Sequence, residues 1–259
     1  MSVVATSTVG TVDWLDLSTP DVIGSMEFYA EVFDWDFHRS DAELGTYYTA
    51  RIGTDEVAGL MERAPGVPAF VPAMWAMFVR VESADASTAR AQLIGGSVIE
   101  PPFDIPGSGR IAVLADPAGA VFSVISGAEG LGMIKDHPGA LAGCEILSRD
   151  VDAARHFYAD MFGWSAAVDL DSGYITMTLD DREVAGLMAM PPEVPADAPS
   201  HWLPYFGTDD CERACAAVRA SGGSIAMPVR AFDVKDAHVK MAVVEDPLGA
   251  MFGLIEHID

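Results

Sequence analysis

The stretch EFYAEVFDW, residues 27–35, returns later in the chain as HFYADMFGW, residues 156–164. The shared aromatic residues lie 129 positions apart. In the second copy His156 and Asp160 stand one helical turn apart, a spacing that would bring two reactive side chains together. In the first copy both places hold glutamate, so the pair is not shared chemistry. We predict that both stretches are packing helices whose His and Asp side chains lie in solvent.

Other blocks recur in the same order. VAGLM at 57–61 is repeated letter for letter at 184–188, and DPAGAVF at 116–122 returns as DPLGAMF at 246–252. Offsets that drift only from 127 to 130 indicate a duplicated domain, and the glycine-rich stretch between the copies has the composition of a linker. The predicted organisation is a first domain at 8–127, a linker at 128–139 and a second domain at 140–259.

Within each domain the hydrophobic pattern indicates a strand and a helix followed by more strands, and then the same order again. In the first helix Thr19 is the expected cap and Pro20 the expected first-turn residue. A second helix is expected to be capped by Ser83, and Asp116–Gly119 has the composition of a tight turn between the last two strands. The fold class is therefore α+β, with four copies of one β-α-β-β(-β) unit. The predicted strands of the first domain cover 12–18, 45–61, 74–81, 98–101, 110–115 and 120–125.

The bulk composition narrows the function classes. Lys plus Arg number 15 against 39 Asp plus Glu, a net charge of −24, so neither nucleic acid nor an anionic membrane surface is an expected partner. The N-terminus carries no secretory signal pattern, and no apolar run is long enough to span a bilayer. The three cysteines, Cys144, Cys211 and Cys215, have no CxxC spacing and are expected to be reduced core residues. We therefore expect a cytoplasmic protein.

A strand that carries an acid, a helix with FYxxxFxW and a terminal DPxGxxF hairpin resemble the vicinal oxygen chelate superfamily, which includes glyoxalase I, bleomycin-resistance proteins and extradiol dioxygenases. More narrowly, the chain resembles tandem glyoxalase-like proteins of actinobacteria, some of which are labelled hydroxylases. The resemblance covers nearly the whole chain, twice. It implies that each domain pairs two βαβββ units into an open, curved, eight-stranded sheet around a cleft.

The resemblance also implies where a metal would be bound, on the first and last strands of each unit. The corresponding positions of this chain hold Trp14, Ala76 and Ser123 in the first domain and Gly143, Leu203 and Gly253 in the second. A stable divalent site needs at least three N, O or S ligands, so we expect no metal and no other cofactor. The alternative is a retained site in the second domain. It would start from Glu145, the equivalent of Asp16, together with His201.

Without a metal, the implied cleft is a binding surface. Its expected walls are aromatic and soft, which suits a small hydrophobic or aromatic molecule. The candidate ligand-binding residues are Trp14, Asp16, Trp75, Phe78 and Phe103 in the first domain and Trp202, Tyr205, Phe232 and Met241 in the second.

Two function classes follow. The first is a metal-free tandem binding protein for a small aromatic or hydrophobic metabolite, acting as a monomer or homodimer. The second is an enzyme of the superfamily, a lyase, isomerase, cyclase or hydroxylase, with its chemistry in the second domain. Its candidate catalytic residues are Glu145, His201 and His238. A third arrangement, in which one domain only scaffolds the other, also places function in the second domain.

Overall fold

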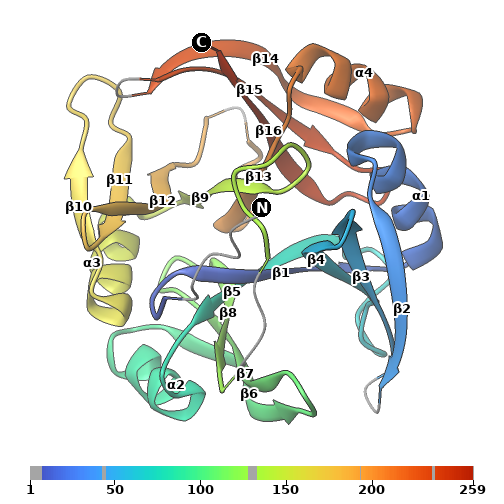
Figure 1. Cartoon of the computed structure of the whole chain (residues 1–259). Coiled ribbons are helices and arrows are strands. Elements are labelled where there is room, and N and C mark those ends of the chain that lie inside the picture. The colour runs from blue at the N-terminus through green and yellow to red at the C-terminus, as the bar shows by residue number, and fades with distance from the viewer. Residues whose placement is uncertain (1–7, 43–44, 128–132, 193, 235–236, 259) are drawn as a thin grey trace.

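The structure, a computed structural model, describes residues 8–42, 45–127, 133–192, 194–234 and 237–258. The N-terminal residues 1–7 and the first part of the expected linker, 128–132, lie outside the described residues. The chain forms two eight-stranded mixed sheets with two helices each (Figure 1). This confirms the expected α+β class with four successive βαβββ units.

The first sheet and its helices are built in chain order from β1 (Val12–Thr19), α1 (Val22–Phe33), β2 (Asp36–Ala42), β3 (Gly45–Ile52), β4 (Asp55–Glu62), β5 (Met74–Arg80), α2 (Ala84–Leu93), β6 (Ser97–Ile105), β7 (Gly109–Ala115) and β8 (Val121–Ser126). The second half repeats the order with β9 (Leu141–Ser148), α3 (Val151–Phe162), β10 (Ser165–Val168), β11 (Ile175–Leu179), β12 (Arg182–Ala189), β13 (His201–Gly207), α4 (Cys211–Ala220), β14 (Ser224–Val234), β15 (Ala237–Glu245) and β16 (Met251–Ile258).

Both sheets have the same strand order. It is β2-β3-β4-β1-β5-β8-β7-β6 in the first and β10-β11-β12-β9-β13-β16-β15-β14 in the second. The two units of each domain meet where their first strands pair antiparallel, β1 with β5 and β9 with β13. Because the end strands of each order have one neighbour, the sheets are open, as the resemblance implied.

The first helix begins two residues later than the sequence pattern predicts. Asp21, in extended conformation, accepts a hydrogen bond from the backbone N–H of Gly24 and is the N-cap. Thr19 is the last residue of β1 and its hydroxyl bonds Ser25 instead. The prediction of Thr19 as cap was wrong, because the residue directly before the first helical turn supplies the capping oxygen. Asp150 caps α3 in the same way.

The tight turn before β8 forms as expected. Asp116 Oδ1 accepts from the backbone N–H groups of Ala118 and Ala120, and Gly119 has a positive φ of 93°. The equivalent Asp246 holds the turn before β16 through Leu248 and Ala250. The repeated DPxG motif therefore positions the last strand of each domain.

Strand register separates the two faces of each sheet. On β1 and β5, Leu15 pairs with Met77 and Leu17 with Trp75, all buried. Because successive side chains point to opposite faces, the intervening Trp14 and Asp16 lie on the other face. We call that face of each sheet its carboxylate face, since it carries Asp16 in the first sheet and Glu145 in the second.

The opposite faces of the two sheets share one aromatic core. Phe33 contacts Phe206 at 5.1 Å between ring centroids, and Phe122 contacts Tyr158 at 5.7 Å, so each sheet meets rings of the other domain. Tyr29 donates to Asp246 of the second domain at 3.1 Å. Tyr158 and Asp116 make the equivalent electrostatic contact. The FYxxxFxW helices are thus packing elements, as predicted, and they also join the domains.

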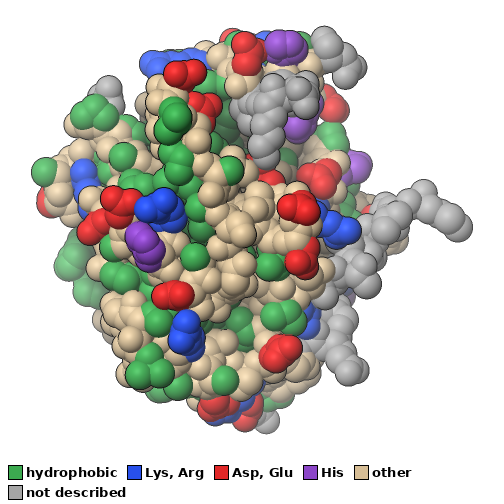
Figure 2. Space-filling view, turned by 90° about the vertical axis from the view of Figure 1, so that its left-hand side faces the viewer, with side chains coloured by type: hydrophobic (Ala, Val, Ile, Leu, Met, Phe, Trp, Pro, Cys, Tyr) green, Lys and Arg blue, Asp and Glu red, His purple; other side chains and the backbone are tan. Residues whose placement is uncertain are grey.

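Polar and apolar side chains are mixed on the face of the molecule that Figure 2 shows. Figure 2 shows one face, where hydrophobic, acidic and basic side chains are interspersed rather than gathered in one patch. Among the described helices none is both long and apolar enough to cross a membrane. All three cysteines are buried and free, as the sequence predicts.

Candidate functional site: a buried carboxylate on each sheet

A compact polar group lies on the carboxylate face of the first sheet. Asp16 Oδ1 accepts from the Tyr47 hydroxyl at 2.6 Å and from Trp14 Nε1 at 2.9 Å. The indole N–H of Trp14 also lies 2.8 Å from the Tyr47 hydroxyl oxygen, to which it donates. These three side chains come from β1 and β3, which are separated by β4 in the sheet.

The second sheet holds a related group with one important difference. Glu145 Oε2 accepts from the Tyr205 hydroxyl at 2.8 Å, and Tyr174 provides a second hydrogen bond. Tyr174 occupies the position of Tyr47, and Tyr205 occupies that of Phe78. The place of Trp14 is taken by Gly143. The acid keeps two donors, but one of them now comes from β13 rather than from β9.

The repeated VAGLM motif explains how the tyrosines reach the acids. Gly59 on β4 pairs with Asp16, and Gly186 on β12 pairs with Glu145. A Cβ on Gly59 would lie 1.8 Å from the Tyr47 hydroxyl oxygen, and one on Gly186 would lie 1.9 Å from that of Tyr174. Each glycine therefore leaves a gap in the middle strand that the phenol crosses.

We expect Gly186→Ala to displace the Tyr174 phenol from Glu145 and to lower the free energy of unfolding by about 1–3 kcal/mol, the usual cost of overpacking. Urea unfolding measures the loss. The matched control is Gly143→Ala on the neighbouring strand, because a Cβ there meets no atom within 4 Å and should change stability by less than about 0.5 kcal/mol. Equal effects of the two substitutions would contradict this account of the motif.

Burial makes both acids weaker than ordinary carboxylic acids. Desolvation raises the pKa of Asp16 from 3.8 to about 6, against the opposing effect of the hydrogen bonds from Tyr47 and Trp14. Desolvation likewise raises the pKa of Glu145, and the hydrogen bonds from Tyr205 and Tyr174 oppose it. The pKa values of Tyr47 and Tyr205 are raised by burial and by the adjacent carboxylates. The tyrosines therefore remain hydrogen-bond donors at neutral pH, while the two carboxyl groups bind their protons more tightly than exposed carboxylic acids do.

The chain matches known protein families over most of its length. The description "Glyoxalase-like domain" matches residues 14–125, and "Glyoxalase/Bleomycin resistance protein/Dioxygenase superfamily" matches residues 140–254. The chain belongs to this superfamily. "Putative glyoxylase CFP32" of Mycobacterium tuberculosis is 31% identical over 254 residues, which cover 95% of each chain. "Anthracycline biosynthesis protein DnrV" of Streptomyces peucetius is 31% identical over 265 residues, which cover 94% of this chain and 92% of the relative.

Solved structures of the superfamily share the fold at low identity. The Mn(II)-bound glyoxalase from Novosphingobium aromaticivorans gives a TM-score of 0.67 at 16% identity, covering 98% of this chain and 85% of the other. The 2,3-dioxygenase LapB from Pseudomonas sp. KL28 gives 0.66 at 13% identity, covering 98% and 96%. At these identities the likeness concerns the fold, and chemistry has to be argued from the side chains of this chain.

The residues at the positions implied for a superfamily metal do not fit a divalent ion. The first domain has Trp14, Ala76 and Ser123 there, and the second has Gly143, Leu203 and Gly253, so one serine hydroxyl is the only candidate donor among these six side chains. The nearest carboxylates, Asp16 and Glu145, already accept hydrogen bonds from phenols and an indole. Within the described ranges there is no group of three or more His, Cys, Asp or Glu side chains that could hold a metal.

The carboxylate face of the second sheet has its own apolar cluster, separate from the shared aromatic core. Strand register puts Leu147, Leu203 and Tyr205 on the same face as Glu145. Val194 from the proline-rich connector after β12 also packs there, as do several methionines. The buried members are Leu147, Met190, Leu203 and Tyr205, and the half-buried ones are Met188, Val194, Met241, Val243, Met251 and Ile255.

The two candidate histidines lie in different places. His201 opens β13 on the face of Leu203 and pairs with Leu147, and its ring bonds the carbonyl of Pro199. His238 pairs with Asp233 on the exposed β14–β15 hairpin. In the strand order β15 is three strands from β9. The structure therefore brings His201, but not His238, to the neighbourhood of Glu145.

The candidate aromatic residues also lie in different parts of the two sheets. Trp14 and Phe78 lie side by side on the carboxylate face. Trp75 and Trp202 belong to the shared aromatic core, where their indole N–H groups donate to Tyr29 and Tyr158. Phe103 and Phe232 lie on the terminal strands β6 and β14, and Phe232 is exposed. Of the candidate rings, then, Trp14 and Tyr205 donate hydrogen bonds to the buried acids, and Phe78 lies beside Trp14 on the same face.

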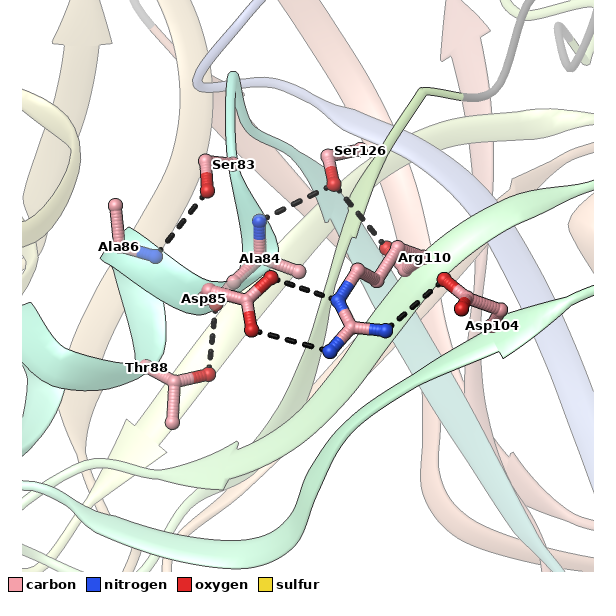
Figure 3. Close-up of polar contacts among 8 residues, drawn as sticks. All are labelled: Ser83, Ala84, Asp85, Ala86, Thr88, Asp104, Arg110 and Ser126. Atoms are coloured by element: carbon pink, nitrogen blue, oxygen red, sulfur yellow. Dashed lines mark hydrogen bonds and ion pairs between the residues drawn. The ribbon is translucent and has the colours of Figure 1, made fainter.

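A separate surface pocket of about 640 Å³ lies at the N-terminus of α2. Figure 3 shows Arg110 between Asp85 and Asp104, with bonds of 2.7 Å from Nε and 3.0 Å from Nη1. Hydrogen bonds to the two aspartates raise the pKa of the arginine, and Arg110 lowers that of Asp85. Because these carboxylates already neutralise the guanidinium, the pocket presents no uncommitted cation to an anionic ligand.

Proposed function

We propose that the chain is a binding protein that holds a small hydrophobic or aromatic metabolite on the carboxylate face of its second domain, without a metal. The observation that carries this proposal is the methionine-rich cluster that contains Tyr205 and lies on the same face as buried Glu145. Methionine side chains adapt to irregular apolar ligands. A few fixed polar groups within an apolar lining give a ligand its orientation. The name of the relative DnrV, an anthracycline biosynthesis protein, agrees with a natural-product ligand.

Calorimetric titration with indole, 2-naphthol and 1,4-dihydroxyanthraquinone tests this function. We expect at least one of them to bind, and Met241→Gln to weaken that binding about tenfold by placing an amide in the apolar lining. Met74→Gln is the matched control, because Met74 is an exposed methionine of the first domain, and it should leave the affinity unchanged. Failure of all three compounds to bind, or equal weakening by both variants, would count against the proposal.

The metal-free character is tested separately, by elemental analysis of protein purified without chelator. Substoichiometric metal is expected, because the donor positions hold one serine and otherwise only indole, aliphatic and glycine residues. One equivalent of Zn, Ni, Mn or Fe per chain would overturn it.

The second candidate function is an enzyme of the superfamily, a lyase, isomerase, cyclase or hydroxylase-type protein. The specific observation in its favour is the raised pKa of Glu145 beside an apolar surface, the condition that lets a carboxyl group act as a general acid or base near neutral pH. The discriminating variant is Glu145→Gln, assayed on any compound that binds. Loss of product formation with retained binding would establish the enzyme, and absence of product with wild-type protein would favour the binding protein.

A further inference from the structure

The two domains differ at one position beside the buried acid. Trp14 stands two residues before Asp16 and pairs with Phe78, and Gly143 stands two residues before Glu145 and pairs with Tyr205. Strand, face and register are therefore the same in both domains. At this position the first domain has an indole ring, and the second domain has no side chain.

The indole of Trp14 has the environment of a bound ligand. It is almost fully buried, and its single N–H lies within hydrogen-bonding distance of both Asp16 Oδ1 and the Tyr47 hydroxyl. The first domain thus encloses a flat, two-ring aromatic group. A carboxylate and a phenol accept the hydrogen bond from its single N–H. These are the means by which a protein recognises an aromatic N–H compound.

In the second domain the carboxylate and the phenol are present and the indole ring is missing. The Tyr205 hydroxyl, which donates to Glu145 Oε2 at 2.8 Å, is the second donor to the acid. Glu145 and Tyr174 stand in the places of Asp16 and Tyr47, and Gly186 keeps the gap that brings them together. A Cβ built on Gly143 meets no atom within 4 Å. Gly143 and Tyr174 are half-buried whereas Glu145 is buried, so solvent reaches the glycine and the tyrosine but not the acid.

We propose that the second domain binds a flat aromatic compound bearing an N–H or O–H donor, seated beside Gly143 in the position that the Trp14 indole occupies in the first domain. The donor is shared between Glu145 and the Tyr174 oxygen. The first domain is occupied by its own side chain, so each chain takes one ligand. This inference rests on the proposed function and names its ligand class and seat.

The test uses indole as the probe, with full-length protein and calorimetric stoichiometry. Wild type is expected to bind one indole, and Gly143→Trp to lose at least tenfold in affinity because the new side chain fills the seat. Trp14→Gly should open the first domain, so that the variant binds two indoles and regains thermal stability when indole is added. Benzofuran, which has the same shape without a donor, should bind wild type about tenfold more weakly, since it offers Glu145 and the Tyr174 oxygen no hydrogen bond.

Folding of each variant is checked by circular dichroism, and Gly143→Leu replaces Gly143→Trp if the larger side chain prevents folding. Unchanged indole affinity in whichever of these two Gly143 variants folds would overturn the proposed binding position. So would binding of indole to Trp14→Gly alone, without binding to wild type. If Met241→Gln weakens the other probes while the Gly143 variants do not, this inference fails and the proposed function stands. If no probe binds wild type, both fail.

Discussion

Replacing Tyr158 with alanine is expected to lower the free energy of unfolding by about 3–5 kcal/mol, the range for removing a large buried aromatic side chain. Tyr158 is fully buried. Its ring stacks on Trp164 at 5.7 Å and meets Trp202 edge-on at 5.4 Å, and Phe122 of the other domain lies 5.7 Å away. The substitution therefore opens a cavity in the core that the two domains share. Urea unfolding followed by far-ultraviolet circular dichroism measures the loss.

Tyr158→Phe separates the ring from its hydroxyl. It keeps the packing but leaves the Trp202 indole N–H, which donates to that hydroxyl at 2.9 Å, without its acceptor. The expected loss is about 1–3 kcal/mol, the cost of one buried unpaired donor. Leu93→Ala, at a highly exposed leucine, is the neutral control. A loss in Tyr158→Ala no larger than in Leu93→Ala would mean that the aromatic core does not hold the domains together.

The shared core also predicts how the protein unfolds. Because Phe33 packs on Phe206 and Phe28 on Phe252, neither domain can unfold without exposing rings of the other. The two sheets should therefore lose structure in one transition rather than two, as one cooperative core requires.

Much of the fold could be predicted from the sequence because the repeat is nearly literal. Two copies of VAGLM and of DPxGxxF fix the order of strands in each domain, and the DPxG turn has a local cause in Asp116 that sequence alone reveals. The cap at Asp21 was missed because Thr19 and Asp21 are both capping residues. Only the point where β1 ends decides between them.

The surroundings of the site were harder to predict. Alternation along β5 places Trp75 and Phe78 on opposite faces, but it does not say which face is covered by a second domain. The sequence therefore predicts Trp75 as a ligand-binding residue, although its ring belongs to the shared core. Tyr47 and Tyr174 were missed because their hydroxyls reach the acids across an intervening strand. The sequence does contain a signal for these tyrosines, because both VAGLM copies have the same glycine with a tyrosine 12 residues before it.

The buried acid of the first domain predicts a stability change that depends on pH. A carboxyl group whose pKa is raised from 3.8 to about 6 binds its proton more tightly in the folded than in the unfolded protein. Ionised Asp16 therefore costs stability, and the cost grows as the pH rises from 3.8 to 6 and is complete above that range. The difference between a pKa of 3.8 and one of about 6 corresponds to about 3 kcal/mol in the free energy of unfolding.

Asp16→Asn replaces the acid with a neutral group whose oxygen still accepts from Tyr47 and Trp14. We expect the variant to be about 2–3 kcal/mol more stable than wild type at pH 8, with most of that gain gone at pH 4, where folded Asp16 is already protonated. Asp41→Asn is the control of opposite sign, because hydrogen bonds from Arg39 and Thr46 lower the pKa of exposed Asp41. Urea unfolding at pH 4 and pH 8 measures the free energy of unfolding of each variant relative to wild type. A stability difference between Asp16→Asn and wild type that is equal at pH 4 and pH 8 would show that the pKa of folded Asp16 is not raised, and that its phenol and indole donors offset the effect of burial.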